Sequence, residues 1–142
     1  MAHVSLITLA VDDLTAATRF YETMGWRRSS ASVDDTVAFL RGGAVLLGLF
    51  GREDLATDAG VPPSSGGGPA VALAMNVPTE QVVDETLAAA ARAGGRVSKP
   101  AQRTDWGGYS GYFTDLDGHL WEVAHNPGSR LMADGRVLLP DE

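Results

Sequence analysis

The segment from Trp106 to Pro127 decides the fold, and it reads WGGYSGYFTDLDGHLWEVAHNP. The pattern predicts two short strands, Tyr109 to Thr114 and Leu120 to His125, joined by an Asp-Leu-Asp-Gly turn. One carboxylate, Glu122, falls in the middle of the second strand. Acidic side chains are disfavoured inside strands unless they face water or a site that uses them. Glu122 is therefore the first candidate for a functional residue.

The position of the turn sets which residues share a face with Glu122. If Asp115 to Gly118 form the hairpin loop, Phe113 pairs with Leu120 and Gly111 pairs with Glu122. Strand alternation then places on the face of Glu122 the residues Tyr109, Gly111, Phe113 and Leu120. The opposite face, under a helix, receives Tyr112, Trp121 and Val123.

The rest of the chain repeats one order of elements. The pattern of the first half predicts a strand at Val4 to Val11 and a helix at 14 to 24, capped by Asp13 and ended by Gly25. Three further strands are predicted at Trp26 to Ser32, Thr36 to Arg41 and Ala44 to Phe50. A two-residue turn is expected at Gly42-Gly43. The second half predicts the same order at Ala70 to Val77, Pro78 to Gly94, Arg96 to Lys99 (closed by Pro100), Tyr109 to Thr114 and Leu120 to His125.

These elements divide the chain into two βαβββ modules, residues 1–56 and 70–127. A linker rich in Gly, Pro and Ser spans residues 57–69, and a C-terminal tail spans residues 128–142. A four-stranded sheet covered by one helix keeps an open face, so one module cannot close a core alone. We expect an α+β fold in which the two tandem modules form a curved mixed sheet around a cup.

Composition narrows the class of protein. The chain has 142 residues, a formal net charge of −7, 44% hydrophobic residues and no cysteine. The negative charge argues against nucleic acid as a partner, because binding phosphates needs clustered Lys and Arg. Asp12 and Asp13 end the apolar N-terminal run well short of a membrane span. Without a basic leader or a cleavage site, a cytoplasmic protein with no membrane partner is expected.

Two motifs resemble the vicinal oxygen chelate superfamily, which contains glyoxalases, ring-cleaving dioxygenases and bleomycin-resistance proteins. The first is Leu9-Ala10-Val11-Asp12-Asp13-Leu14, followed by Phe20-Tyr21-Glu22 and Gly25, and the second is the segment from Trp106 to Pro127. The resemblance implies the tandem βαβββ arrangement over Val4 to Pro127, and it also implies a homodimer.

The resemblance further implies metal ligands on the first and last strands of each module. Only Glu122 matches. The expected first-strand histidine falls on Leu6, with His3 three residues earlier, and its second-half counterpart falls at Ala70 or Val71. A non-standard site built from Glu122, Glu53 and one rearranged histidine stays open, with Zn, Ni, Mn or Fe as the metal.

With the other expected metal ligands missing, the predicted site is an apolar and aromatic cup with one acid, Glu122. Its expected lining comprises Leu6, Thr8, Ala10, Trp106, Tyr109, Gly111, Phe113 and Leu120. The alternative, that the aromatic residues simply fill a core, stays open. A cup of this kind predicts a protein that binds or sequesters a small cationic or aromatic molecule without a cofactor. The alternatives are a metal-dependent lyase, isomerase or dioxygenase acting on vicinal oxygens, and metal-free acid–base catalysis with Glu122 as the base.

Overall fold

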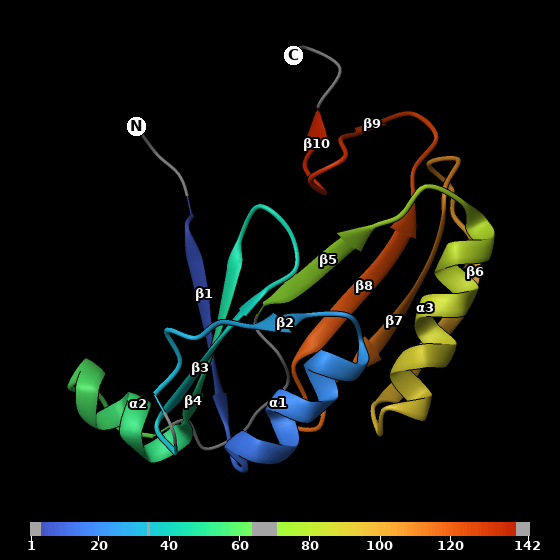
Figure 1. The fold of residues 1–142 in the computed structure, drawn as a ribbon. Helices are drawn as coiled ribbons and strands as arrows, with labels where there is room; N and C mark the ends of the chain where they lie inside the picture. The colour runs from blue at the N-terminus through green and yellow to red at the C-terminus, as the bar shows by residue number, and fades with distance from the viewer. Residues whose placement is uncertain (1–3, 34, 64–70, 139–142) are drawn as a thin grey trace. The chain divides into compact units, whose positions relative to one another are not determined.

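The computed structural model describes residues 4–33, 35–63 and 71–138. His3, Ala70 and residues 64–69 of the expected linker lie outside the described residues. The chain divides into two compact units, Met1–Gly68 and Pro69–Glu142 (Figure 1). Each unit carries a strand, a helix and three strands, so the predicted tandem βαβββ fold is confirmed. The shared cup stays a prediction.

The first unit contains one mixed sheet of four strands. Its elements are β1 (Leu6–Val11), α1 (Leu14–Thr23), β2 (Arg27–Arg28), β3 (Val37–Arg41), β4 (Leu46–Gly51) and α2 (Arg52–Ala59). The strand order is β1-β4-β3-β2, in which β1 and β4 are parallel and the other pairs are antiparallel. The parallel pair arises because α1 carries the chain across the sheet between the first strand and the hairpin.

The second unit repeats this topology. Its elements are β5 (Ala72–Asn76), α3 (Glu80–Arg92), β6 (Arg96–Arg103), β7 (Tyr109–Thr114), β8 (Leu120–His125), β9 (Arg130–Leu131) and β10 (Val137–Leu138). The sheet order is β5-β8-β7-β6, with β5 and β8 parallel. In the tail, β9 and β10 form a separate antiparallel pair.

Both long helices lie within the expected ranges. The Asp13 carboxylate accepts a hydrogen bond from the Ala16 N–H and caps α1, and Thr79 caps α3 in the same way. After each helix a glycine takes a left-handed conformation, Gly25 at φ 101° and Gly94 at φ 104°.

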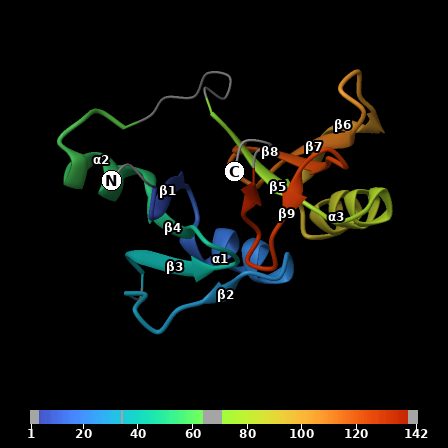
Figure 2. The same ribbon diagram turned by 90° about the horizontal axis from the view of Figure 1, so that it is seen from above.

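One face of each sheet is buried against a helix. In the first unit the buried side chains include Leu9, Val11, Phe20 and Tyr21. In the second unit α3 lies along one side of its sheet, as Figure 2 shows, and buries Val83 and Leu87 among strand residues. The candidate residues are therefore divided between a helix-covered face and the opposite face of each sheet.

Four details differ from the sequence prediction. The strand expected at Trp26 to Ser32 is limited to β2, Arg27–Arg28. Helix α2 was not expected, and it extends into the segment assigned to the linker. Strand β6 does not close at Pro100 but continues to Arg103, because it is an edge strand with bulges on both sides of Lys99, where a proline is tolerated. The β3–β4 loop spans residues 42–45 rather than a two-residue turn.

Within the described part of the chain, no helix is both long enough and apolar enough to cross a membrane.

Candidate functional site

The loop between β7 and β8 is one residue shorter than the predicted loop. Asp115 N donates to His119 O at 3.0 Å, which extends the ladder and leaves a loop of residues 116–118. Gly118, at φ 84°, supplies the left-handed residue that ends such three-residue loops. The buried Asp115 carboxylate fixes the turn by accepting from Asp117 N at 2.9 Å and His119 N at 2.8 Å.

The shorter loop changes every pair of the hairpin. Thr114 pairs with Leu120, Tyr112 pairs with Glu122, and Gly111 pairs with Val123. The predicted register is therefore wrong, since a shift of one residue moves a strand's side chains to the other face. Tyr109, Gly111 and Phe113 lie on the face opposite Glu122, whereas Tyr112 lies on the face of Glu122.

Tyr112 and Glu122 form the polar centre of the face that α3 does not cover. The Tyr112 hydroxyl donates a hydrogen bond to Glu122 Oε2, and both side chains are half-buried. The pKa of Tyr112 is raised, chiefly by this hydrogen bond to the carboxylate and then by burial, because both favour the neutral hydroxyl. The pair is thus a carboxylate held by a phenol on a partly open surface.

Small side chains flank this pair on the neighbouring strand. Ala74 of β5 is the register partner of Glu122, and Ala72 is the register partner of Leu120. Both alanines are exposed. Leu120 shares the face of Glu122, as predicted, because the two residues are two positions apart on β8. The β5 side of the carboxylate is therefore bordered by methyl groups rather than by bulky side chains.

The other residues predicted to surround Glu122 pack under α3. A Cβ added at Gly111 would lie 2.6 Å from Leu87 Cδ1 and 2.9 Å from Lys99 O, so only glycine fits there. Phe113 is buried and stacks on Trp121, with ring centroids 6.1 Å apart and planes 1° from parallel. For Phe113 the core interpretation is therefore correct, and Gly111 packs beside it under α3.

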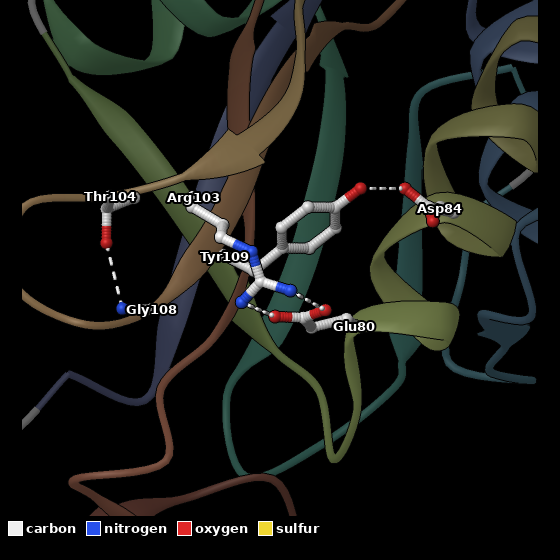
Figure 3. A network of polar contacts seen from close by, with 6 residues as sticks. All are labelled: Glu80, Asp84, Arg103, Thr104, Gly108 and Tyr109. Carbon is white, nitrogen blue, oxygen red and sulfur yellow. Dashed lines mark hydrogen bonds and ion pairs between the residues drawn. The ribbon is translucent and has the colours of Figure 1, made fainter.

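Tyr109 belongs to a polar network that joins β6 and β7 to α3 (Figure 3). Its hydroxyl donates to Asp84 Oδ1 at 2.7 Å, and this hydrogen bond raises the pKa of Tyr109. Beside it, Arg103 forms a two-fold contact with Glu80, at 3.0 and 3.4 Å. Tyr109 therefore holds the hairpin on the first turns of α3 and does not face Glu122.

Trp106 lies in the loop between β6 and β7. The Thr104 hydroxyl accepts from Gly108 N at 2.9 Å, which closes this loop (Figure 3). The Trp106 ring covers Gly108, where an added Cβ would overlap it, while 54% of Trp106 stays exposed. The predicted position of Trp106 over a cup stays a prediction.

The candidates of the first unit share one face of β1. Leu9 and Val11 are buried toward α1, so alternation places Leu6, Thr8 and Ala10 on the other face. Gly48 lies on that face as well, since a Cβ there would be 3.2 Å from Thr8 Oγ1. These three residues therefore share one face of β1, and a ligand-binding role for them stays a prediction.

Known proteins share this fold, with its two sheets of the same topology. The family model of the Glyoxalase/Bleomycin resistance protein/Dioxygenase superfamily matches residues 1–123. This chain belongs to that superfamily.

Solved structures of the superfamily agree with this assignment. A glyoxalase-related enzyme from Fulvimarina pelagi is 35% identical, with a TM-score of 0.88 over 98% of this chain and 99% of its own. A superfamily enzyme from Burkholderia phytofirmans PsJN has a TM-score of 0.77 at 21% identity, over 87% of this chain and 98% of its own. A lactoylglutathione lyase from Agrobacterium tumefaciens has a TM-score of 0.68 at 22% identity, over 89% of this chain and 95% of its own. No curated protein matches the chain.

Among the residues that the structure describes, the donor set does not fit the metal that the superfamily implies. Leu6 lies seven residues before the cap of α1, as expected. The cap of α3 at Thr79 moves the equivalent position of the second unit from Ala70 or Val71 to Ala72, which is no metal ligand either. The counterpart of Glu122 on β4 is Gly48, since Thr8 pairs with Gly48 as Ala74 pairs with Glu122. Over residues 4–33, 35–63 and 71–138, no three His, Cys, Asp or Glu side chains converge as metal ligands.

The two described histidines have structural surroundings. His119 ends the β7–β8 turn, where its N–H donates to Asp115. His125 pairs with Tyr109 on the helix-covered side, and its Nδ1 lies 3.3 Å from Val77 O.

Tyr112 is the functional candidate that sequence reasoning missed. The available signal was the glycine at the end of Asp115-Leu116-Asp117-Gly118. A glycine there favours a three-residue loop with a left-handed third residue, and this loop pairs Tyr112 with Glu122.

Proposed function

We propose that this superfamily member binds a small molecule with a positive charge and a flat ring, on the face of the β5–β8 sheet that carries Tyr112 and Glu122. The observation that carries the proposal is the half-buried Glu122 carboxylate, oriented by the Tyr112 hydroxyl beside exposed alanines. A carboxylate held in one orientation pairs with a cation at a lower entropic cost than a mobile one.

The surroundings of the carboxylate support a cationic and partly apolar ligand. Leu120 and the methyl groups of Ala72 and Ala74 offer apolar contact next to the charge. The Tyr112 ring offers a π-face, which attracts cations. The net charge of −7 favours approach of a cation over an anion. We propose sequestration or transport of such a molecule, with the homodimer as the assembly.

One observation favours a second candidate, metal-free acid–base catalysis. Tyr112 supplies a hydrogen-bonding partner to Glu122, and its hydroxyl is protonated at neutral pH, as an ordinary tyrosine is. In that case Glu122 takes a proton from the substrate and Tyr112 donates a hydrogen bond to the oxygen that gains charge. The relative from Fulvimarina pelagi, described as an enzyme, supports this alternative.

Calorimetric titration with benzyltrimethylammonium and with metal-free bleomycin tests the binding proposal. Neutral benzyl alcohol is the comparison ligand. We expect the cations to bind and the Glu122→Gln variant to bind them about ten-fold more weakly, as one charge-assisted contact predicts. Tyr112→Phe should weaken binding by a smaller factor, because the carboxylate keeps its charge but loses its orientation.

Tyr109→Phe is the matched control, since it also removes a hydroxyl that donates to a carboxylate, but on the helix-covered face. It should leave the affinity unchanged. Equal affinity of wild type and Glu122→Gln would overturn the proposed site. Turnover of a vicinal-oxygen substrate that disappears in Glu122→Gln would favour the catalytic alternative instead.

A further inference from the structure

Three arginines gather at the edge of the first unit's sheet, far along the chain from Glu122. Arg27 and Arg28 make up the edge strand β2, and Arg41 ends β3. Arg27 and Arg41 are direct register partners, and all three side chains are exposed. Two like charges placed directly opposite each other on neighbouring strands repel, and this arrangement destabilises a sheet.

Within the part of the chain that the structure describes, no carboxylate neutralises this pair. Arg52, Arg103 and Arg136 each form an ion pair with a carboxylate. Of the residues that the structure describes, none forms an ion pair with Arg27 or Arg41. The contrast is notable because acidic residues outnumber basic ones, 18 to 11. Two neighbouring positive charges that destabilise the sheet are therefore present in a chain that has more carboxylates than basic groups.

The arginines surround a groove of about 300 Å³. Its lining consists of Arg27, Arg28, Ser29, Ser30 and Arg41. Arg28 also borders a second groove of about 520 Å³, which runs beside α1 and includes Arg19 together with Glu22 and Asp35. The first groove is thus lined only by cationic and hydroxyl side chains, whereas the second also carries acids.

The backbone around the groove is held in place by packing. The Trp26 ring lies over Gly42, where an added Cβ would be 2.5 Å from the ring, so the residues next to Arg27 and Arg41 are in close contact. Ser29 N donates to Phe39 O at 2.8 Å and continues the β2–β3 pairing. The two guanidinium groups are therefore carried on neighbouring strands of fixed register rather than on a free loop.

We propose that this groove binds the phosphate group of a small phosphorylated molecule. Planar guanidinium groups bind phosphate oxygens in a bidentate way, and serine hydroxyls donate to the remaining oxygens. A doubly charged anion between Arg27 and Arg41 converts their repulsion into two attractions. One groove of about 300 Å³ suits a single phosphate group, whereas nucleic acid needs a long basic surface that a chain of charge −7 does not offer. The inference does not depend on the role proposed for Glu122.

The test is calorimetric titration of the full chain with inorganic phosphate and with phenyl phosphate, at constant ionic strength set by chloride. We expect saturable binding, with affinity lowered about ten-fold or more in Arg27→Gln/Arg41→Gln. The matched control is Arg92→Gln, which removes an exposed arginine at the end of α3. Without phosphate the double variant should melt at a temperature equal to or above that of wild type, since it loses the repulsion.

A second variant, Arg27→Lys, keeps the charge and removes the bidentate geometry, so it should bind with intermediate affinity. Equal affinity of wild type and the double variant would overturn the inference, as would a double variant that melts well below wild type. Tighter binding of a single-stranded oligonucleotide than of phenyl phosphate would overturn the small-molecule assignment. Unchanged binding of benzyltrimethylammonium in the double variant is expected, because that ligand tests the site around Glu122.

Discussion

The Tyr112 hydroxyl donates to the Glu122 carboxylate across the β7–β8 pair, and each residue is the other's direct register partner. Cross-strand partners have Cβ atoms close together, so this contact needs no backbone adjustment. The hydrogen bond fixes the orientation of the one carboxylate that the superfamily resemblance singled out. The candidate site is therefore a pair of residues rather than a single acid.

The first prediction concerns the ionisation of tyrosine. Glu122→Gln should lower the pKa of Tyr112, because the hydrogen bond to a charged carboxylate is the main cause of its rise. Asp84→Asn should act in the same way on Tyr109 and serves as the comparison. Titration of the tyrosinate absorbance of folded protein checks both. An unchanged titration curve in Glu122→Gln would contradict the pair.

The same shift has a consequence for stability at high pH. The folded pKa of Tyr112 is raised above its ordinary value of 10.0, so the stabilisation is complete below pH 10. It is lost as the pH rises further and passes the folded pKa. Tyr112→Phe should therefore unfold with a shallower dependence on pH above 10 than wild type does, which denaturant unfolding at a series of pH values measures.

The second prediction tests the role of Gly111. Gly111→Ala should lower the free energy of unfolding by about 1–3 kcal/mol, since the new methyl group overlaps Leu87 and the β6 backbone. Gly128→Ala is the control, because its nearest contact is the flexible Asn126 side chain at 3.3 Å. Urea unfolding compares the two. Similar losses in both variants would argue against the close packing at Gly111.

The third prediction concerns the buried carboxylate of the β7–β8 turn. Asp115→Ala should lower the free energy of unfolding by about 1–3 kcal/mol, because the Asp117 and His119 N–H groups lose their acceptor. Asp115→Asn keeps one acceptor oxygen and should cost less. Both values come from denaturant unfolding. If Asn is as destabilising as Ala, the negative charge rather than the acceptor geometry stabilises the turn.

The fourth prediction concerns metal. Protein purified without a polyhistidine tag and incubated with Zn, Ni, Mn or Fe should hold far less than one equivalent after desalting, since the described donor set does not converge. Metal analysis of wild type and Glu122→Gln provides the measurement. Stoichiometric metal that is lost in Glu122→Gln would establish the metal-dependent alternative.

Local signals in the sequence determined most of the fold. The order of elements, the caps at Asp13 and Thr79 and the glycines that end both helices were predictable, because capping and periodicity act within a few residues. The division into two modules followed from that order. Helix α2 was missed because it has one buried residue, Ala56, and hence no apolar periodicity to detect.

Only the tertiary structure decided which side chains surround Glu122. Register depends on the length of a single turn, and one residue more or less exchanges the two faces of a strand. The left-handed Gly118 and the buried Asp115 shorten that loop. They place Tyr112 beside the carboxylate and move Tyr109 to α3. Composition and alternation are the same in both registers, and Gly118 is the one local signal that favours the shorter loop.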